Sequence, residues 1–257
     1  MIAADMSMDS IATWLRQADR IVVFTGADLS KASGIPTYRD SGGLWTKTGN
    51  MRFAYAQALA EDTDAFLAFW AQRRAELENA RPNPGHHALA ALQRAKPLTT
   101  LVTQNVDGLL AKAGATDVVE LHGNLFRTVC QACGARNPDA DERSRCRECA
   151  SAQPSVRPDV VMFGEMLDPA VLARAEFEAK CCDLLMAVGT SAVVYPAAGL
   201  PEKAKSRGAR VAVINAEPIE LAHLADAEVI GASEDLLPRL MLMAGIASAS
   251  ALSGALG

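Results

Sequence analysis

Short runs of β-branched and other apolar residues recur along the chain, and stretches with helical periodicity lie between several of them. Such runs, bounded by glycine or polar residues, are typical of parallel strands buried on both faces. The expected strands are residues 20–25, 98–103, 117–121, 184–188, 210–214 and 228–230. The expected helices are residues 9–19, 86–95, 169–180 and 197–206. This alternation predicts an α/β fold with one parallel sheet covered by helices on both faces, as in dinucleotide-binding folds.

Four of the six cysteines form two C-x₂-C pairs separated by twelve residues, namely Cys130, Cys133, Cys146 and Cys149. Two such pairs close a tetrahedral site, so the spacing predicts one zinc ion bound by four thiolates. Four protein ligands leave no open position for water, so we expect a structural zinc. The alternative is a redox pair or unrelated thiols. Cys181 and Cys182 precede an expected strand, and we expect buried thiols there.

Two segments interrupt the alternation of strands and helices. Residues 38–85 begin with a glycine-containing loop and continue into charged, helix-like sequence. Residues 127–157 hold the cysteine pairs and few apolar residues, so a metal must stabilise them. We therefore expect a smaller helical and zinc-ribbon domain inserted into a Rossmann-like domain. The expected ranges are 38–85 and 127–157 for the smaller domain, and 1–37, 86–126 and 158–257 for the larger one.

The composition is that of a globular protein, with 50% hydrophobic and 21% charged residues. The net charge of −5 gives no sign of a basic face for nucleic acid. No window of about 18 uncharged apolar residues occurs, so we expect no membrane span. The first residues lack the basic and apolar regions of a signal peptide. We expect a cytoplasmic protein that is a monomer or a weak oligomer, with no nucleic-acid or membrane partner.

A glycine-containing loop follows the first expected strand. It reads Thr25-Gly-Ala-Asp-Leu-Ser-Lys-Ala-Ser-Gly-Ile-Pro-Thr-Tyr-Arg39 and continues as Asp40-Ser-Gly-Gly-Leu-Trp45. A tight turn from a strand into a helix brings backbone N–H groups to a pyrophosphate. The glycine spacing does not make G-x-G-x-x-G, but the whole string resembles the sirtuin signature G-A-G-x-S-x-x-S-G-I-P-x-F-R…G-L-W.

Further blocks in the order of the sirtuin family extend this resemblance from about residue 20 to about residue 240. They are T-Q-N-V-D at 103–107, E-L-H-G at 120–123, R-P-D-V-V-M-F-G-E at 157–165, G-T-S at 189–191 and N-A-E at 215–217. The resemblance implies an NAD⁺-dependent protein-lysine deacylase. In that reaction the acyl oxygen of a modified lysine attacks the ribose C1′ as nicotinamide leaves, and the acyl group passes to ADP-ribose. Acyl-lysine proteins or peptides are the implied substrates.

The resemblance also assigns roles to single residues. His122 is the implied base, and a near-neutral histidine suits activation of a ribose hydroxyl. Asn105 positions the ribose and a water, and is the second implied catalytic residue. Asp107 faces the nicotinamide pocket, or is a turn residue before Gly108. The complete expected cofactor set is Gly26, Ala27, Asp28, Tyr38, Arg39, Trp45, Gln104, Asn105, Asp107, His122, Gly189, Thr190, Ser191, Asn215 and Ala232. Ser30 and Ser33 are expected at most as helix caps.

The peptide substrate is expected to add as a strand against residues 160–164 and 193–195. The segment Trp70-Ala-Gln-Arg73 resembles the place where sirtuins that remove succinyl or malonyl groups carry a tyrosine and an arginine three residues apart. On that interpretation Arg73 pairs with an acyl carboxylate. The alternative is a solvated arginine on an amphipathic helix. The expected substrate residues are Trp70, Arg73, Val160, Val161, Phe163, Gly164 and Val193.

Asp28 stands where the sirtuin signature has its second glycine. Glycine permits a positive φ and a close backbone approach, and a carboxylate adds a negative charge beside the pyrophosphate. Tyr38 replaces a phenylalanine and Leu110 replaces a histidine common in the family. Two alternative functions stay open at this point. One is a protein ADP-ribosyltransferase, and the other is a catalytically weak module that binds NAD⁺ or acyl-lysine.

Overall fold

The computed structural model describes residues 2–37, 50–137, 146, 148–149 and 156–247. The α-helices are α1 (Ile2–Gln17), α2 (Gln57–Glu61), α3 (Thr63–Glu78), α4 (Pro84–Ala95), α5 (Leu109–Lys112), α6 (Pro169–Cys181), α7 (Leu200–Lys205) and α8 (Ser233–Met243). The strands are β1 (Ile21–Thr25), β2 (Thr99–Thr103), β3 (Val118–Glu120), β4 (Gly123–Cys130), β5 (Arg136–Asn137), β6 (Val156–Val160), β7 (Leu184–Val188), β8 (Arg210–Asn215) and β9 (Ala227–Ile230). Short 3₁₀ helices are η1 (Ala27–Ser33), η3 (Asn50–Ala54), η4 (Ala197–Gly199) and η5 (Glu220–Leu224).

Six strands form one parallel sheet in the order β3-β2-β1-β7-β8-β9. Every residue of β1, β2 and β7 is buried, which explains why these strands are β-branched and apolar runs without alternation. The chain leaves β1 for β2 on one side and returns on the other side as β7. Strand order therefore reverses at β1, and ligands bind outside the carboxyl ends of parallel strands at such a point.

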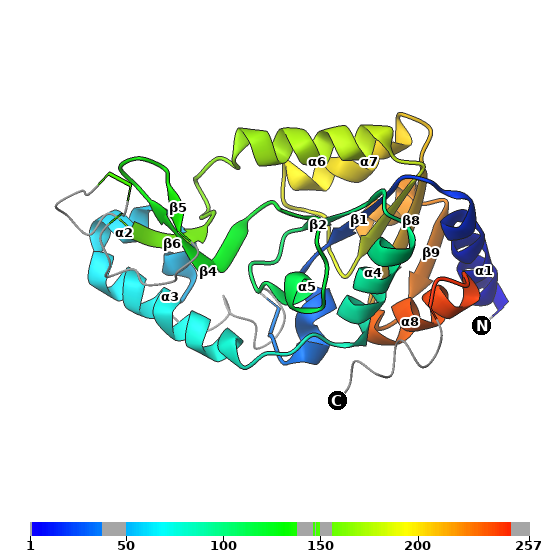
Figure 1. Cartoon of the computed structure of the whole chain (residues 1–257), viewed down its shortest axis with the longest axis horizontal. Coiled ribbons are helices and arrows are strands. Elements are labelled where there is room, and N and C mark those ends of the chain that lie inside the picture. The colour runs from blue at the N-terminus through cyan, green and yellow to red at the C-terminus, as the bar shows by residue number, and fades with distance from the viewer. Residues whose placement is uncertain (1, 38–49, 138–145, 147, 150–155, 248–257) are drawn as a thin grey trace.

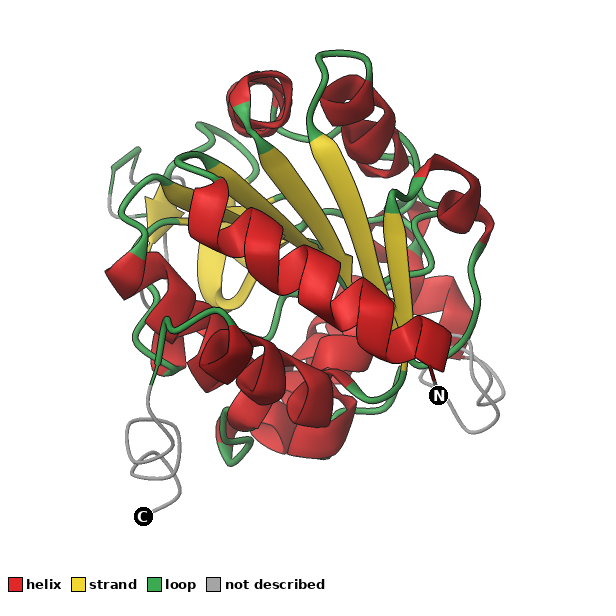
Figure 2. Cartoon of the chain, turned by 90° about the vertical axis from the view of Figure 1, so that its right-hand side faces the viewer, coloured by secondary structure: helices red, strands yellow, loops and turns green. Residues whose placement is uncertain are grey.

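Helices cover both faces of this sheet (Figures 1 and 2). One hydrophobic core joins α1, α4 and α8 to the sheet, and includes Ile11, Leu89 and Leu237. The core on the other face joins α6 and α7 to the sheet, through residues such as Ala175 and Leu200. The expected α/β fold with a parallel sheet covered on both faces is confirmed.

A smaller antiparallel sheet, in the order β5-β4-β6, lies beside the large one together with α2 and α3 (Figure 1). We call residues 50–78, 123–137 and 156–165 the small module. Its core packs Phe66 and Trp70 of α3 against Leu125 of β4 and Met162. The three-stranded sheet begins at Gly123, so the expected domain boundary at residue 127 falls inside β4.

The expected element bounds differ from the observed ones in several places. The first helix is α1 at Ile2–Gln17, where residues 9–19 were expected, and residues 197–206 divide into η4 and α7. Helix α8 was not expected from the sequence. Cys182 is buried, but Cys181 is exposed, so the expectation of two buried thiols is wrong for Cys181.

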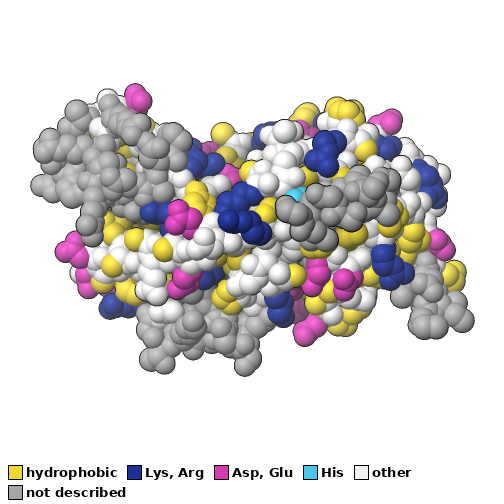
Figure 3. All heavy atoms as spheres, turned by 60° about the horizontal axis from the view of Figure 1, so that its bottom comes forward, with side chains coloured by type: hydrophobic (Ala, Val, Ile, Leu, Met, Phe, Trp, Pro, Cys, Tyr) yellow, Lys and Arg dark blue, Asp and Glu magenta, His cyan; other side chains and the backbone are white. Residues whose placement is uncertain are grey.

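None of the helices in the described ranges is both long enough and apolar enough to cross a membrane. On the face shown in Figure 3, Lys and Arg side chains are interspersed with acidic and hydrophobic ones.

Candidate active site

Two backbone turns form the floor of a cleft at the carboxyl ends of β1 and β7. Gly26 follows β1, and its N–H donates to Val188 O over 3.2 Å, while Asp28 N–H donates to Gly189 O over 3.0 Å. A Cβ at position 26 would lie 2.7 Å from Thr190 Cβ, and a Cβ at position 189 would lie 2.5 Å from Leu29 N. The two turns therefore approach too closely for any residue but glycine at either position.

A cleft of about 650 Å³ opens above these turns. Its lining brings together most of the expected site residues, from the large sheet and from the small module. They are Gly26, Ala27, Asp28, Trp70, Gln104, Asn105, His122, Val160, Val161, Phe163, Gly164, Gly189, Thr190, Ser191 and Val193. Three expected cofactor residues, Tyr38, Arg39 and Trp45, lie outside the described residues.

His122 follows β3 and faces the cleft beside the residues that end β2. Its Nδ1 lies 2.9 Å from Gln104 O. A carbonyl oxygen only accepts, so Nδ1 carries the proton and the Nε2 lone pair is left for chemistry. Burial lowers the pKa of His122 below its ordinary value of 6.5, and the hydrogen bond to Gln104 opposes this shift. The imidazole is therefore neutral near pH 7, as a general base must be.

Asn105 is held by its side-chain amide at the end of β2. Nδ2 donates to Gly26 O over 3.0 Å and to Ser30 Oγ over 3.1 Å. Both N–H bonds are thus used within the protein, and Oδ1 is the polar atom left to meet a bound group. Beside it, Gln104 Nε2 donates to Thr190 Oγ1 over 2.8 Å, which ties the end of β2 to the turn after β7.

Asp107 and Ser30 form a buried polar network beneath Asn105. Ser30 Oγ donates to Asp107 Oδ2 over 2.7 Å and lies 3.3 Å from His86 Nε2. Burial raises the pKa of Asp107, while the hydrogen bonds from Ser30 and from Leu109 N–H oppose the rise. Asp107 lines a small cavity and, through Leu109 N–H, is also a turn residue, while its place at a nicotinamide pocket stays a prediction.

His86 is a member of this network that the sequence analysis did not single out. Burial and, less strongly, the charge of His87 lower its pKa to about 3, so it is neutral. Its Nδ1 accepts from Asn83 N–H over 3.3 Å, which leaves Nε2–H to donate to Ser30 Oγ. The expectation that Ser30 is only a helix cap is wrong. The one sequence signal for His86 was the histidine pair in Asn-Pro-Gly-His-His at residues 83–87.

Arg73 and Trp70 lie on the wall of a small adjoining cavity, together with Ser30, Asn105 and Asp107. Arg73 is only 8% exposed, so its interpretation as a solvated helix arginine is wrong. Its Nη1 donates to Glu76 Oε2 over 2.7 Å. Trp70 Nε1 is buried without a hydrogen-bond partner in the described structure. A guanidinium and an indole N–H thus stand next to the inner end of the cleft.

Asn215 and Ala232 lie beyond the cleft lining, at the carboxyl ends of β8 and β9. Gly231 N–H donates to Asn215 O over 2.8 Å, which joins the two strand ends. Asn215 Oδ1 and Ser233 Oγ are buried and have no partner in the described structure. Buried polar atoms without partners are costly unless a ligand satisfies them. The glycine floor and these orphaned atoms fit a dinucleotide laid across the sheet edge.

The four cysteines of the two C-x₂-C pairs cluster as the spacing predicts, and all four Sγ atoms lie within 4.8 Å of one another. Cys130 and Cys149 Sγ are 3.7 Å apart, and Cys133 and Cys146 Sγ are 3.6 Å apart. Tetrahedral zinc with Zn–S bonds of about 2.3 Å places sulfur atoms about 3.8 Å apart. The residues present therefore fit one zinc ion closed off from water.

The chain is similar to proteins of one family over most of its length. A model of the Sir2 family matches residues 26–196. The NAD-dependent protein deacylase 2 of Pyrobaculum aerophilum is 41% identical over 236 residues, which cover 90% of this chain and 94% of that protein. A solved Sir2 homologue in complex with NAD matches with a TM-score of 0.84 and 36% identity, covering 93% of this chain and 94% of that one. A Sir2 protein with a deacetylated p53 peptide and 3′-O-acetyl-ADP-ribose matches with a TM-score of 0.82 and 27% identity, covering 93% and 99%.

Proposed function

This chain belongs to the Sir2 family and is an NAD-dependent protein deacylase, and from that premise we propose the roles of its residues. NAD⁺ supplies the ADP-ribose that accepts the acyl group and the nicotinamide that leaves. A zinc ion on the four clustered cysteines is structural. Acyl-lysine peptides are the substrates, in keeping with the peptide held by the related Sir2 protein.

His122 is the general base in this proposal. The geometry that carries the assignment is its Nδ1–H bond to Gln104 O, which fixes the tautomer and leaves Nε2 as the acceptor of a proton. The lowered pKa keeps the ring neutral at physiological pH. Asn105 stands beside it with Oδ1 available and holds the ribose or an attacking water. General bases need this combination of reach and near-neutral pKa.

The other expected cofactor residues divide between the two ends of the dinucleotide. The pyrophosphate lies over the turns at Gly26 and Gly189, which line the cleft. The N–H groups of Gly26, Asp28 and Gly189 bond within the protein, so the neighbouring turn residues Ala27, Thr190 and Ser191 are its proposed contacts. Asp107 and its partner Ser30 face the nicotinamide end. Asn215 and Ala232 hold the adenosine end, where Asn215 Oδ1 and Ser233 Oγ lack protein partners. Tyr38, Arg39 and Trp45 stay predictions.

The peptide enters along residues 160–164, opposite residues 193–195. Phe163 pairs with Tyr55 through a parallel β-bridge on one edge, and Val161 N–H donates to His122 O over 3.0 Å. The segment continues from the end of β6 at Val160, contacts the base at Val161, and turns at Gly164. Added strands bind by main-chain hydrogen bonds and demand little of the peptide sequence. We also propose, from the composition, that the chain works in the cytoplasm as a monomer or weak oligomer.

Incubation of the protein with NAD⁺ and an acetyl-lysine peptide, followed by mass spectrometry, tests the proposed role of His122. The wild type and His223→Ala should release free lysine peptide and O-acyl-ADP-ribose, because His223 is exposed and is not among the residues that line the cleft. His122→Ala should lose at least about a hundredfold in kcat while still binding zinc. Turnover by His122→Ala at the wild-type rate would refute the base. ADP-ribose transferred to protein would favour the transferase alternative, and binding without turnover would favour the binding module.

A second activity, removal of succinyl or malonyl groups, is favoured by the burial of Arg73 in the cavity wall. A guanidinium forms a forked pair with a carboxylate, and Arg73 has further N–H groups besides the one on Glu76. Trp70 Nε1–H can donate to the same carboxylate. Arg73→Met should raise KM for a succinyl-lysine peptide at least about tenfold more than for an acetyl-lysine peptide. An equal effect on both peptides would exclude acyl recognition by Arg73.

A further inference from the structure

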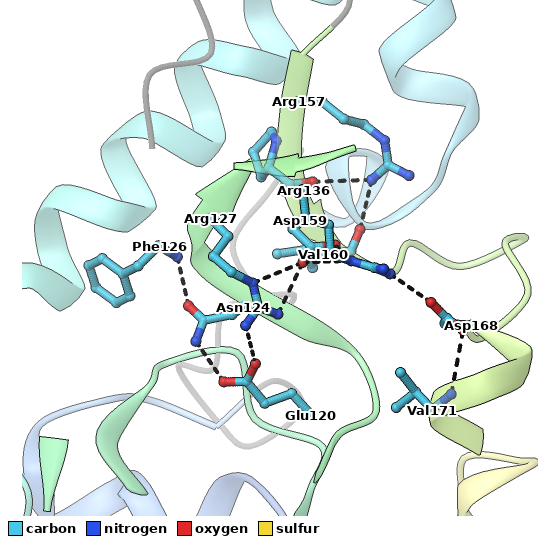
Figure 4. A network of polar contacts seen from close by, with 11 residues as sticks. Glu120, Asn124, Phe126, Arg127, Arg136, Arg157, Asp159, Val160, Asp168 and Val171 are labelled. Carbon is cyan, nitrogen blue, oxygen red and sulfur yellow. Dashed lines mark hydrogen bonds and ion pairs between the residues drawn. The ribbon is translucent and has the colours of Figure 1, made fainter. Parts of the chain in front are cut away.

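A chain of ion pairs joins the small module to the large sheet at the root of the peptide-binding strand (Figure 4). It runs from Glu120 of β3 through Arg127 of β4 to Asp159 of β6. From there it continues through Arg136 of β5 to Asp168, which precedes α6. None of these residues belongs to the cofactor or substrate set described above.

Asp159 is the centre of this chain. Its side chain lies between two arginines, as Figure 4 shows, with Oδ2 at 3.0 Å from Arg127 Nη2 and at 3.2 Å from Arg136 Nε. Arg127 Nε donates to the same oxygen over 3.1 Å. Asp159 is buried, whereas Arg136 is about half exposed. A buried carboxylate with two arginines is strongly held, and its removal leaves Arg127 paired only with Glu120 and Arg136 paired only with Asp168.

On one side the network reaches the strand that carries the base. Arg127 Nη1 donates to Glu120 Oε2 over 2.6 Å, and Glu120 lies two residues before His122. Glu120 Oε1 in turn accepts from Asn124 Nδ2 over 2.6 Å. Glu120 is therefore fixed at both carboxylate oxygens, which holds the end of β3 against β4.

On the other side the network reaches the peptide-binding strand directly. Asp159 immediately precedes residues 160–164, and the backbone of His122 and Gly123 packs on it. Val161 N–H donates to His122 O over 3.0 Å, and a Cβ added to Gly123 would lie 2.0 Å from Asp159 O. His122 therefore contacts the segment proposed to bind the peptide. This contact lies next to Asp159, whose side chain is held by Arg127 and Arg136.

The second end of the network fixes the small module to α6. Arg136 Nη2 donates to Asp168 Oδ2 over 2.9 Å, and Asp168 Oδ1 accepts from Ala170 N–H, which caps α6. Helix α6 packs on the large sheet through Ala175 and Ala179. Arg136 lies three residues after Cys133 of the zinc cluster. Through Arg127, Asp159 is therefore linked to Glu120 at the end of β3. Through Arg136 of β5, it is linked to Asp168 at the start of α6.

We propose that Asp159 is a positioning residue for deacylation, which sets the peptide-binding strand at residues 160–164 relative to His122 through Arg127 and Arg136. This inference rests on the proposed role of His122. Placement of reacting groups matters steeply, because a small misplacement costs up to about a hundredfold in rate. Asp159 is not among the residues that line the cleft, so its effect is on alignment and not on chemistry.

The test compares Asp159→Asn, which keeps the shape and removes the charge, with Arg174→Met. The control breaks the exposed ion pair of Arg174 with Asp117, which also joins α6 to the segment of β3. Asp159→Asn should lower kcat/KM for the acyl peptide at least about tenfold. Its affinity for ADP-ribose should stay within about twofold of the wild type, because Gly26 and Gly189 lie outside the network. One zinc per chain should remain. Arg174→Met should match the wild type in all three.

Amide hydrogen exchange gives a readout that does not depend on turnover. The N–H of Val161, which donates to His122 O, should exchange faster in Asp159→Asn and at the wild-type rate in Arg174→Met. Arg127→Lys keeps the positive charge but loses the several N–H donors of the guanidinium. Its kcat/KM and its Val161 N–H exchange rate should therefore lie between those of the wild type and Arg127→Met. These arginine variants decide the case if Asp159→Asn does not fold.

Unchanged exchange at Val161 in Asp159→Asn would overturn the inference, even if turnover fell. Turnover within about twofold of the wild type would overturn it as well. A wild-type protein that removes no acyl group would contradict the proposed function instead, and Val161 exchange would still decide the role of Asp159.

Discussion

At the level of single residues, the environment of His122 fixes the pH range in which it acts. Burial lowers its pKa below 6.5, so the ring stays neutral to a lower pH than a free histidine does. The acid limb of kcat/KM should therefore have its midpoint below pH 6.5, and the rate should be flat from there to about pH 8. A pH profile of kcat/KM, measured with the acetyl-lysine peptide at concentrations well below KM, tests this. An acid limb centred above pH 6.5 would contradict the buried neutral base.

Asp28 departs from the glycine of the family signature, and the structure separates its two effects. Among the described residues, the only non-glycine residue with a positive φ is Ala192, so Asp28 introduces no left-handed strain. Asp28 is among the residues that line the cleft beside Gly26. The part of the expected loss of NAD⁺ affinity that remains is the repulsion between the negative charge of Asp28 and the proposed pyrophosphate.

Asp28→Gly and Asp28→Asn should therefore tighten NAD⁺ binding equally, by about tenfold at low ionic strength. Asparagine keeps the size of the side chain and removes the charge, so it is the matched control for backbone effects. Added salt should narrow the difference, because screening weakens only the charge term. Isothermal titration at two salt concentrations measures it. Equal affinities of all three proteins at low salt would show that the charge does not reach the phosphates.

At the level of secondary structure elements, the strands of the large sheet could be predicted closely. They are buried on both faces, so β1, β2 and β7 are apolar and β-branched runs that end in glycine or polar residues. Helix α3 was recognised only as charged, helix-like sequence. Its buried face consists of Phe66, Trp70, Arg73 and Leu77, and an arginine in that stripe breaks the apolar pattern. Helix α8 runs unbroken through Pro238, and it was missed because a proline inside a helical pattern argues against a helix.

The residues of the site also divide into those that could be predicted from the sequence and those that could not. Gly26, Gln104, Asn105 and Gly189 follow strand ends, and the carboxyl ends of parallel strands meet at one edge of a sheet. Their placement could therefore be predicted from the strand pattern alone. The contact of Ser30 with His86 could not, because it joins η1 to α4 across 56 residues of sequence. Ion pairs such as the one between Arg136 and Asp168 depend on tertiary packing in the same way.

The close approach of β4 and β6 gives a test at this level. A Cβ at Gly123, where φ is +81°, would lie 2.0 Å from Asp159 O. Gly123→Ala should lower the free energy of unfolding by about 3 kcal/mol or more, because backbone strain and overpacking add. Gly34→Ala is the matched control, since its φ is +80° and no atom lies within 4 Å of the added Cβ. It should cost only about 1 kcal/mol. If urea unfolding gave equal losses of unfolding free energy for Gly123→Ala and Gly34→Ala, β6 would be free to move away from the added Cβ.

At the level of the whole molecule, the two sheets contribute to different parts of the proposed site. The turns after β1, β2 and β7 and the end of β8 supply the residues proposed for the dinucleotide. The small module supplies residues 160–164, proposed to bind the peptide, and the cavity wall with Trp70 and Arg73, proposed to bind the acyl group. We propose on this basis that the small module, like the inserted domain expected from the sequence, acts as a unit for substrate recognition. Its stability depends on the zinc cluster, which has few apolar neighbours.

Removal of zinc should therefore abolish peptide binding before dinucleotide binding. Around the cysteines, the described part of the chain offers only a small core of Cys130, Cys146 and Val156 beside Ala135, so the metal must supply most of the local folding free energy. The large sheet has two extensive cores of its own. Cys146→Ala, or wild type treated with a chelator, should lose the acyl peptide but keep ADP-ribose affinity within about tenfold. Metal analysis and titration of each ligand measure this, with Cys181→Ala as the control for an exposed cysteine outside the cluster. Loss of both ligands in parallel would mean that the large sheet does not hold the dinucleotide site without the small module.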